Sequence, residues 1–374
     1  MPLFPMSGIS AWKDGLHRRT IAKLKVFTDW LTQQNALGYI GEVGWPNAKF
    51  RESMNDVADW DVLAQRWWQA ADAANLWATT FSADEAQVNG GYSLTVYTPI
   101  GDGTTRTIST PKAQAATCEA HLTTANYKRG IHIEPGAYGP EKSTFAAGAS
   151  GTYDTDYWYP SLASYQYLYG RGHRIVRISF RWERLQPTLN AALDTTELNR
   201  LTTSVNNAGT AGLGVILDCH NYGGCYLSAG TETKMTAAGT LTRAHMVDLW
   251  SRLSTAYKNN ANVLAYGLMN EPGPFPGVSS DTKVQASFWA QGAQDCVTAI
   301  RNNADTKLIM VPLYLMDHTN VNIYHPTKFI TDTANNIRYE GHHYFWVLGY
   351  QGGGNYSVDY LTEVNNAANE GWFA

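Results

Sequence analysis

Short apolar runs alternate along the chain with longer segments whose apolar residues recur at helical spacing. A strand buried on both faces is apolar throughout, whereas a surface helix is apolar on one face only, so the alternation predicts parallel strands covered by helices. The predicted strands occupy residues 38–43, 76–82, 129–133, 174–180, 214–219, 263–269, 307–313 and 337–345. The predicted helices occupy residues 12–34, 57–76, 111–122, 196–207, 243–257, 282–302 and 358–368.

The number of strands indicates the fold class. Eight strands that alternate with helices close a (β/α)8 TIM barrel, and 374 residues without a long linker suit one such domain. We therefore predict an α/β protein with a single barrel over residues 1–374. Residues 91–97 are predicted to form a further short extended piece, and the threonine-rich residues 101–110 a surface loop.

Composition narrows the possible partners. A net charge of -4 provides no basic surface, which argues against binding to nucleic acid or to an anionic membrane. No apolar run is long enough to span a bilayer, and residues 1–10 do not resemble a signal peptide. The four cysteines lack a metal-binding spacing; Cys219 and Cys225 are compatible with a disulfide or with two free thiols.

Two glutamates occupy the position that a barrel enzyme reserves for reactive groups. Glu271 follows the apolar run 263–269, with Pro272 closing the strand behind it, and Glu42 ends the run that begins at residue 38. Barrel enzymes present their reactive groups at the C-terminal ends of the strands. Cleavage of a glycosidic bond requires two carboxyl groups, one to protonate the leaving oxygen and one to attack the sugar carbon. The pair therefore predicts a glycosidase.

The sequences around both glutamates carry a family resemblance. Leu268-Met269-Asn270-Glu271-Pro272 and Gly41-Glu42-Val43-Gly44 resemble the acid/base and nucleophile motifs of glycoside hydrolase family 5. In that family the first motif ends the fourth strand and the second ends the seventh, so this chain resembles a circular permutation. Residues 1–125 would correspond to the usual units 7–8 and residues 126–374 to units 1–6, joined by the bridge 123–128. This order predicts that Met1 and Ala374 lie close together.

The resemblance implies eight site residues, each at or near a strand end. They are Arg177, His220, Asn270, Glu271, His342, Tyr344, Glu42 and Trp77. Arg177 interrupts an apolar strand and needs a carboxylate partner, for which Glu42 is suited. By resemblance, His220 and Asn270 would bind sugar hydroxyls, His342 and Tyr344 would tune the two acids, and Trp77 would stack beneath the sugar.

Six further residues are secondary candidates for walls of the cleft, with ordinary packing as the alternative for each. They are Glu134, Asn221, Tyr222, Trp45, Trp182 and Trp346. The adjacent His342 and His343 also suggest a metal, but no third cluster of ligands accompanies them and the hydrolysis needs none. We expect no metal and no cofactor.

The resemblance implies hydrolysis with retention, in which the carboxyl groups lie about 5–5.5 Å apart. The motifs favour an endo-β-1,4-glucanase that acts on a polysaccharide or oligosaccharide. A β-mannanase, another β-glycanase or β-glucosidase of the family, and a non-catalytic glycan-binding barrel are the alternatives. We expect a monomer that is secreted, although the chain carries no visible signal peptide.

Overall fold

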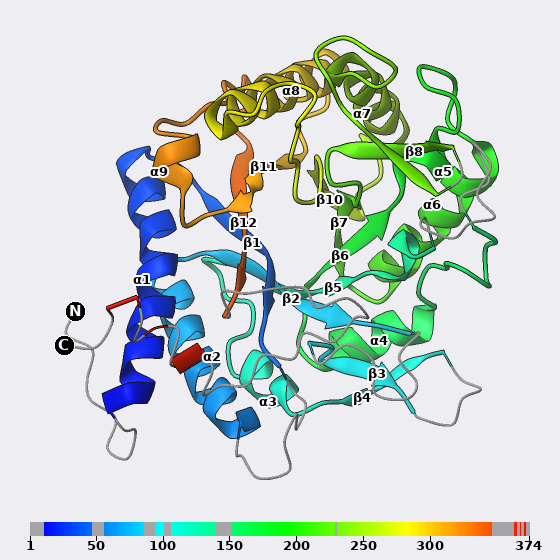
Figure 1. The fold of residues 1–374 in the computed structure, drawn as a ribbon. Helices are drawn as coiled ribbons and strands as arrows, with labels where there is room; N and C mark the ends of the chain where they lie inside the picture. Colours follow the sequence, from blue (N-terminus) through cyan, green and yellow to red (C-terminus); the bar gives the residue numbers. More distant parts are fainter. Residues whose placement is uncertain are drawn as a thin grey trace.

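The computed structural model describes residues 11–46, 56–85, 94–100, 106–139, 151–228 and 230–345, with residues 363, 364, 367, 370 and 371 near the C-terminus. Within these residues, eight parallel strands close into a barrel (Figure 1). In chain order the strands are β1 (Gly38–Gly44), β2 (Trp77–Ala83), β5 (Arg129–Ile133), β6 (Ile175–Phe180), β7 (Gly214–Cys219), β10 (Val263–Gly267), β11 (Leu308–Asp317) and β12 (Ile337–Tyr344). Each strand pairs with the next, and β1 pairs with both β2 and β12. The predicted fold class and all eight barrel strands are thus confirmed.

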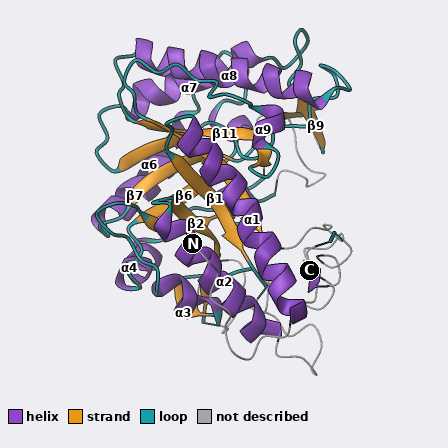
Figure 2. Ribbon diagram, turned by 90° about the vertical axis from the view of Figure 1, so that its left-hand side faces the viewer, coloured by secondary structure: helices purple, strands orange, loops and turns teal. Residues whose placement is uncertain are grey.

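Helices surround the strands (Figure 2). The longer ones are α1 (Ala11–Gln33), α2 (Asp56–Ala73), α4 (Leu162–Gly170), α6 (Thr195–Thr210), α7 (Arg243–Tyr257) and α8 (Thr282–Asn302). Side-chain caps fix where several of them begin, because the oxygen satisfies a backbone N–H that has no partner in the first turn. Ser161 caps α4, Asp194 caps α6 and Asp281 caps α8 in this way. Trp60, Trp67 and Trp68 on α2 are buried, as their helical spacing predicts.

Several smaller elements differ from the sequence prediction. Helix α4 and the hairpin of β8 (Gly224–Ser228) and β9 (Thr231–Lys234) were not predicted. The predicted loop 101–110 ends in β4 (Ile108–Pro111), which pairs with β3 (Tyr97–Pro99). Pro111 therefore ends a strand, and the helix expected to begin there is α3 (Gln114–Glu119). Three further short helices are η1 (Pro135–Ala137), α5 (Trp182–Leu185) and α9 (Val321–Tyr324).

The two ends of the barrel interior differ in chemistry. The N-terminal end is filled by an apolar cluster formed by Tyr39, Trp77, Ile175, Ile216, Ala265, Leu308 and Met310. Towards the C-terminal end, the interior instead holds buried polar and charged side chains, among them Glu42, His132, Arg177 and Asp218. This polarity places the candidate chemistry at the end where barrel enzymes carry it.

The first described helix contacts the C-terminal segment. Arg19 of α1 forms ion pairs with Glu363 and, at 3.1 Å, with Glu370. Met1 and Ala374 lie outside the described residues, as does most of the predicted helix 358–368. In the described part of the chain, no helix has the length and apolar character needed to cross a membrane.

Candidate active site

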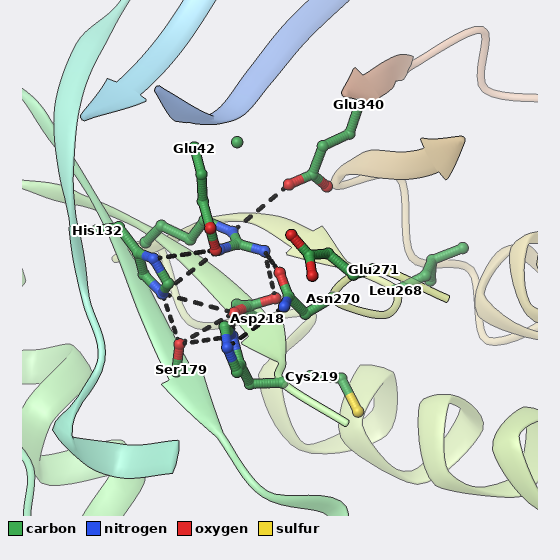
Figure 3. A network of polar contacts seen from close by, with 12 residues as sticks. Glu42, His132, Ser179, Asp218, Cys219, Leu268, Asn270, Glu271 and Glu340 are labelled. Carbon is green, nitrogen blue, oxygen red and sulfur yellow. Dashed lines mark hydrogen bonds and ion pairs between the residues drawn. The ribbon is translucent and has the colours of Figure 1, made fainter. Parts of the chain in front are cut away.

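The two candidate acids meet in the mouth of the barrel (Figure 3). Glu42 lies in β1 beside a register shift, and Glu271 lies four residues beyond the end of β10. One carboxylate oxygen of each lies within 4.8 Å of the other. The side chain of Glu42 is 4% exposed and that of Glu271 is 36% exposed, so only Glu271 reaches well into solvent.

The backbone around Glu271 is held in an unusual conformation. Glu271 has a φ of 40°, in the left-handed region that non-glycine residues rarely adopt. The N–H of Asn270 donates to the carbonyl of Cys219 at 2.7 Å, and the carbonyl of Pro272 accepts from Leu315 at 3.1 Å. Strained backbone of this kind occurs where surrounding contacts fix a functional side chain.

The carboxylate of Glu42 accepts from residues of several strands. Arg177 Nη1 donates to Oε1 at 2.7 Å, and the hydroxyl of Tyr344 donates to Oε2. His132 Nδ1 lies 3.2 Å from Oε1. Burial alone would raise the pKa of Glu42, but His342, His132 and Arg177 together hold it well below its usual value. Glu42 is therefore ionised at neutral pH.

Arg177 connects three strand ends. Its Nη2 donates to Asp218 Oδ1 and to Asn270 Oδ1, both at 2.8 Å. Asp218 is buried, which would raise its pKa, yet Arg177 and His220 lower that pKa to about 2. The guanidinium is thus shared by the buried carboxylates of Glu42 and Asp218, and it orients the amide of Asn270.

His220 is fixed at both ring nitrogens. Its Nδ1 lies 2.7 Å from Asp218 Oδ2, and its Nε2 lies 2.9 Å from the hydroxyl of Tyr222. The amide nitrogen of Asn270 is 3.3 Å from the same Nε2. His220, Asn270 and Tyr222 therefore form one polar group beside the acids.

His342 lies between the two candidate acids. Its Nδ1 is 3.0 Å from Glu271 Oε1 and 3.4 Å from Glu42 Oε2. Burial would lower the pKa of His342, but the neighbouring carboxylates raise it to about 9. The imidazole therefore carries a positive charge at neutral pH.

Two residues of this network were not predicted from the sequence. His132 on β5 is buried, and its Nε2 lies 2.6 Å from Ser179 Oγ. Burial and the charge of Arg177 lower its pKa to about 4, so it is neutral. Glu340 on β12 is also buried, 3.5 Å from Arg177 Nε. Strand register was the available signal, since His132 pairs with Arg177 across β5 and β6.

Trp77 does not lie at the site. It is the first residue of β2, in the apolar cluster at the N-terminal end of the barrel, with the guanidinium of Arg338 4.2 Å from its ring centroid. The platform predicted for Trp77 is thus wrong. Near the other end of β2, Phe81 lies with its ring centroid 6.0 Å from that of Tyr344 and 5.3 Å from that of His132.

The secondary candidates separate into packing residues and residues of the mouth. Trp45 stacks on Phe345, and its Nε1 donates to Asp61 at 2.7 Å. Trp182 is fully buried, and its backbone N–H donates to Asn221 Oδ1 at 2.8 Å. These three side chains pack and brace rather than line a cleft, because none is more than 1% exposed.

Glu134 and Tyr222 remain candidates for the mouth. Glu134 is partly exposed and lies 3.4 Å from the hydroxyl of Tyr138. Burial, with Asp84 and Glu42 nearby, raises its pKa well above the usual value. Trp346 lies outside the described residues.

Several acidic and histidine side chains of the site lie close enough together to be possible metal ligands. Two groups have donor atoms close enough to share an ion, Glu42 with His132 and His220, and Glu42 with Glu271 and His342. Both groups use Glu42, whose oxygen already accepts from Arg177 at 2.7 Å, and the guanidinium would repel a cation there. Cys219 and Cys225 are free and buried, so the disulfide alternative is wrong.

Comparison with known proteins identifies the family. A family model described as cellulase (glycosyl hydrolase family 5) matches residues 140–372. The manganese-dependent endoglucanase Eg5A of Phanerodontia chrysosporium is 28% identical over 170 residues, which are 45% of this chain and 40% of that protein. Endoglucanase gh5-1 of Neurospora crassa is 27% identical over 198 residues, 52% of this chain and 46% of that protein.

Solved structures give similar coverage. XacCel5A in complex with cellopentaose is 30% identical, with a TM-score of 0.48 over 57% of this chain and 64% of that chain. This chain thus spans less than half of the length of the two curated relatives. The family model nevertheless covers more than half of this chain and includes Arg177, His220, Asn270, Glu271 and His342. The chain therefore belongs to the cellulase family, glycosyl hydrolase family 5.

Proposed function

We propose that this protein is a retaining endo-β-1,4-glucanase in which Glu271 is the acid/base and Glu42 the nucleophile. The observation that carries the proposal is the approach of the two carboxylates to within 4.8 Å in the mouth of the barrel. Retaining glycosidases hold their carboxyl groups about 5–5.5 Å apart, whereas inverting ones leave about 6.5–9.5 Å for a water molecule. The short separation favours direct attack by Glu42.

The contacts of each residue suit these roles. Glu42 is ionised and fixed by Arg177 and Tyr344, as a nucleophile must be. Glu271, protonated, gives its proton to the glycosidic oxygen while Glu42 bonds to the anomeric carbon and the leaving chain departs. Glu271 then takes a proton from water, whose oxygen displaces Glu42. Arg177 holds the amide oxygen of Asn270, which leaves the amide nitrogen as a donor for a sugar hydroxyl.

Two of the relatives are named endoglucanases, which supports a β-1,4-glucan as the substrate class. We expect release of reducing sugar from soluble β-1,4-glucan and retention of the anomeric configuration in the first product, followed by proton NMR. A parallel panel of β-mannan, xyloglucan and aryl β-glucosides separates the other activities of the family. No release from any of them, with glycan binding retained, would instead identify a binding protein. Because β-glucan polymers are extracellular, the proposal also implies a secreted protein, and we expect it to act as a monomer.

We further propose that the barrel is circularly permuted relative to the usual order of the family. The family model begins at residue 140, so β1 with Glu42, β2 and β5 precede the matched segment. The closed pairing of β1 with β12 and β2 allows such a permutation, because the ring keeps its neighbours wherever the chain is opened. Arg19 of α1 contacts Glu363 and Glu370, so the first described helix lies beside the described residues near the C-terminus.

The permutation is testable by reversing it. We expect a chain that begins at residue 126, joins residues 374 and 1 through a flexible linker and ends at residue 125 to fold with the same circular dichroism spectrum and to keep its activity. Opening the chain within β6 serves as the control, because it removes a barrel pairing and should prevent folding. If the rearranged chain is unfolded, the bridge 123–128 is not a natural junction between units.

We assign the sugar platform to Phe81 in place of Trp77. Its ring lies beside Tyr344 and His132, which both contact Glu42. Replacing Phe81 by alanine should lower kcat/KM by roughly 2- to 10-fold, since a specific aromatic contact contributes about 0.5–1.5 kcal/mol. Trp77→Phe is the matched control and should lower the melting temperature with little effect on kcat/KM. If Trp77→Phe lowers kcat/KM and Phe81→Ala does not, Trp77 and not Phe81 forms the sugar platform.

A further inference from the structure

Beneath the two acids lies a third carboxylate that the proposed reaction does not use. Glu340 is 1% exposed on β12, and Figure 3 shows it beside Glu42 and Glu271. Its Oε1 is 3.5 Å from Arg177 Nε and 3.7 Å from His342 Nε2. These are ion-pair distances, and among the described residues neither carboxylate oxygen of Glu340 has a hydrogen-bond partner.

The glycine before Glu42 provides the space for this carboxylate. A Cβ at Gly41 would lie 2.0 Å from Glu340 Oε1 and 2.9 Å from His342 Nε2. Any side chain there would push Glu340 away from the imidazole. The Gly-Glu pair of the nucleophile strand thus places both the nucleophile and the gap into which Glu340 fits.

A charge count shows what Glu340 requires. A buried carboxylate is costly unless a cation compensates it. Arg177 is already shared by Glu42 and Asp218, which accept from it at 2.7 and 2.8 Å. If His342 were neutral, three buried carboxylates would depend on one guanidinium. A charged His342 gives Glu340 a partner of its own.

We propose that Glu340 is a positioning residue that keeps His342 in its charged form and points the Nδ1–H of His342 between Glu271 and Glu42. With Glu340 at Nε2, the other N–H of the ring faces the two acids, at 3.0 and 3.4 Å. The imidazolium then supplies one fixed donor and one positive charge to the acid pair. The positioning role of Glu340 rests on the proposed function. The positive charge of His342 does not depend on that function.

Other groups also face His342 and enter its titration. They are Glu42 on β1, Glu271 after β10, Asp317 and His318 on β11, and Arg177 on β6 through Glu42 and Glu340. His318 is buried and its pKa is lowered to about 4, so it adds no charge. The carboxylate of Asp317 accepts hydrogen bonds from Thr319 and Asn320. Among the described residues, Glu340 is the one acid within ion-pair distance of His342 that is not a proposed catalytic group.

The test is the titration of the His342 ring, followed by side-chain NMR in the full-length protein. In the native protein we expect His342 to remain charged well above pH 6.5. In Glu340→Gln its midpoint should fall by about one pH unit or more, since a neighbouring opposite charge shifts a pKa by about 1–3. The activity of Glu340→Gln relative to the native protein should also fall as the pH rises, because His342 then becomes neutral in the variant and its ring loses its fixed orientation.

A matched control separates this role from simple structural support. Asp305 is also buried and accepts from Ser254 and Tyr266, far along the chain from the acids. Asp305→Asn should lower the melting temperature and leave the His342 titration unchanged. An unchanged titration midpoint of His342 in Glu340→Gln would overturn the proposal. If that variant does not fold, a midpoint near pH 6.5 for His342 in the native protein would overturn it. A shifted midpoint in a protein that hydrolyses no glycan would uphold the charge state and refute only the proposed function.

Discussion

Replacing Glu42 by glutamine should abolish hydrolysis while leaving the barrel folded. The amide has the shape of the carboxylate but cannot form the glycosyl-enzyme bond, and loss of a covalent nucleophile costs on the order of 10⁴-fold or more in kcat. The amide oxygen still accepts from Arg177, which donates to Glu42 at 2.7 Å, so the network keeps its geometry. Initial rates on soluble β-1,4-glucan and a thermal melt measure the two effects.

Glu197→Gln is the matched control for this variant. Glu197 is as deeply buried as Glu42, and it accepts from two tyrosine hydroxyls at 2.6 and 2.8 Å on the outer layer of the barrel. Its replacement should lower stability and leave kcat within a few-fold. Hydrolysis by Glu42→Gln at the native rate would remove Glu42 as nucleophile and leave the acid pair without its proposed role.

The barrel was predictable from the sequence because each of its strands is buried on both faces. Residues 175–180 and 214–219 are almost entirely buried, and such strands read as apolar runs between amphipathic helices. Helix α4 was missed because the apolar residues of its sequence, Leu-Ala-Ser-Tyr-Gln-Tyr-Leu-Tyr-Gly, are spread around the helix and do not recur on one side. The β8–β9 hairpin was missed because its residues are mostly polar, so the two strands are defined by their pairing with each other and not by an apolar pattern.

Site residues could be predicted where a sequence motif lies at the end of a strand. They could not be predicted where their place in the site depends on their position along the strand. Glu42, Arg177 and Glu271 come together as their strand ends suggest. The prediction for Trp77 was wrong because Trp77 is the first residue of β2 and therefore lies at the apolar, N-terminal end of the barrel. His132 and Glu340 were missed because a polar residue within an apolar strand is informative only when its neighbours in register are known.

Replacing Arg177 by methionine should have the largest effect on stability. The side chain keeps its volume but leaves Glu42, Asp218 and Glu340 buried without their shared cation. Breaking such a network by removing one partner costs about 3–5 kcal/mol at neutral pH. Activity should fall as well, because the pKa of Glu42 rises when the guanidinium is absent. Arg129→Met, which removes a buried arginine paired with Asp72 at 2.6 Å, should destabilise the fold and keep activity.

The pH dependence distinguishes loss of charge compensation from loss of packing. In the native protein Arg177 helps to lower the pKa of Glu42 and of Asp218, the latter to about 2, so their stabilisation is present above the unfolded value of about 4 and lost as pH falls. Without the guanidinium, Asp218 loses the largest influence that lowers its pKa, so burial raises that pKa and the folded variant binds more protons than the unfolded chain. Its stability should therefore increase from pH 7 to pH 5, and the difference from the native protein should shrink. Urea denaturation at both pH values measures this, and a difference that stays constant with pH would mean that Arg177 contributes packing alone.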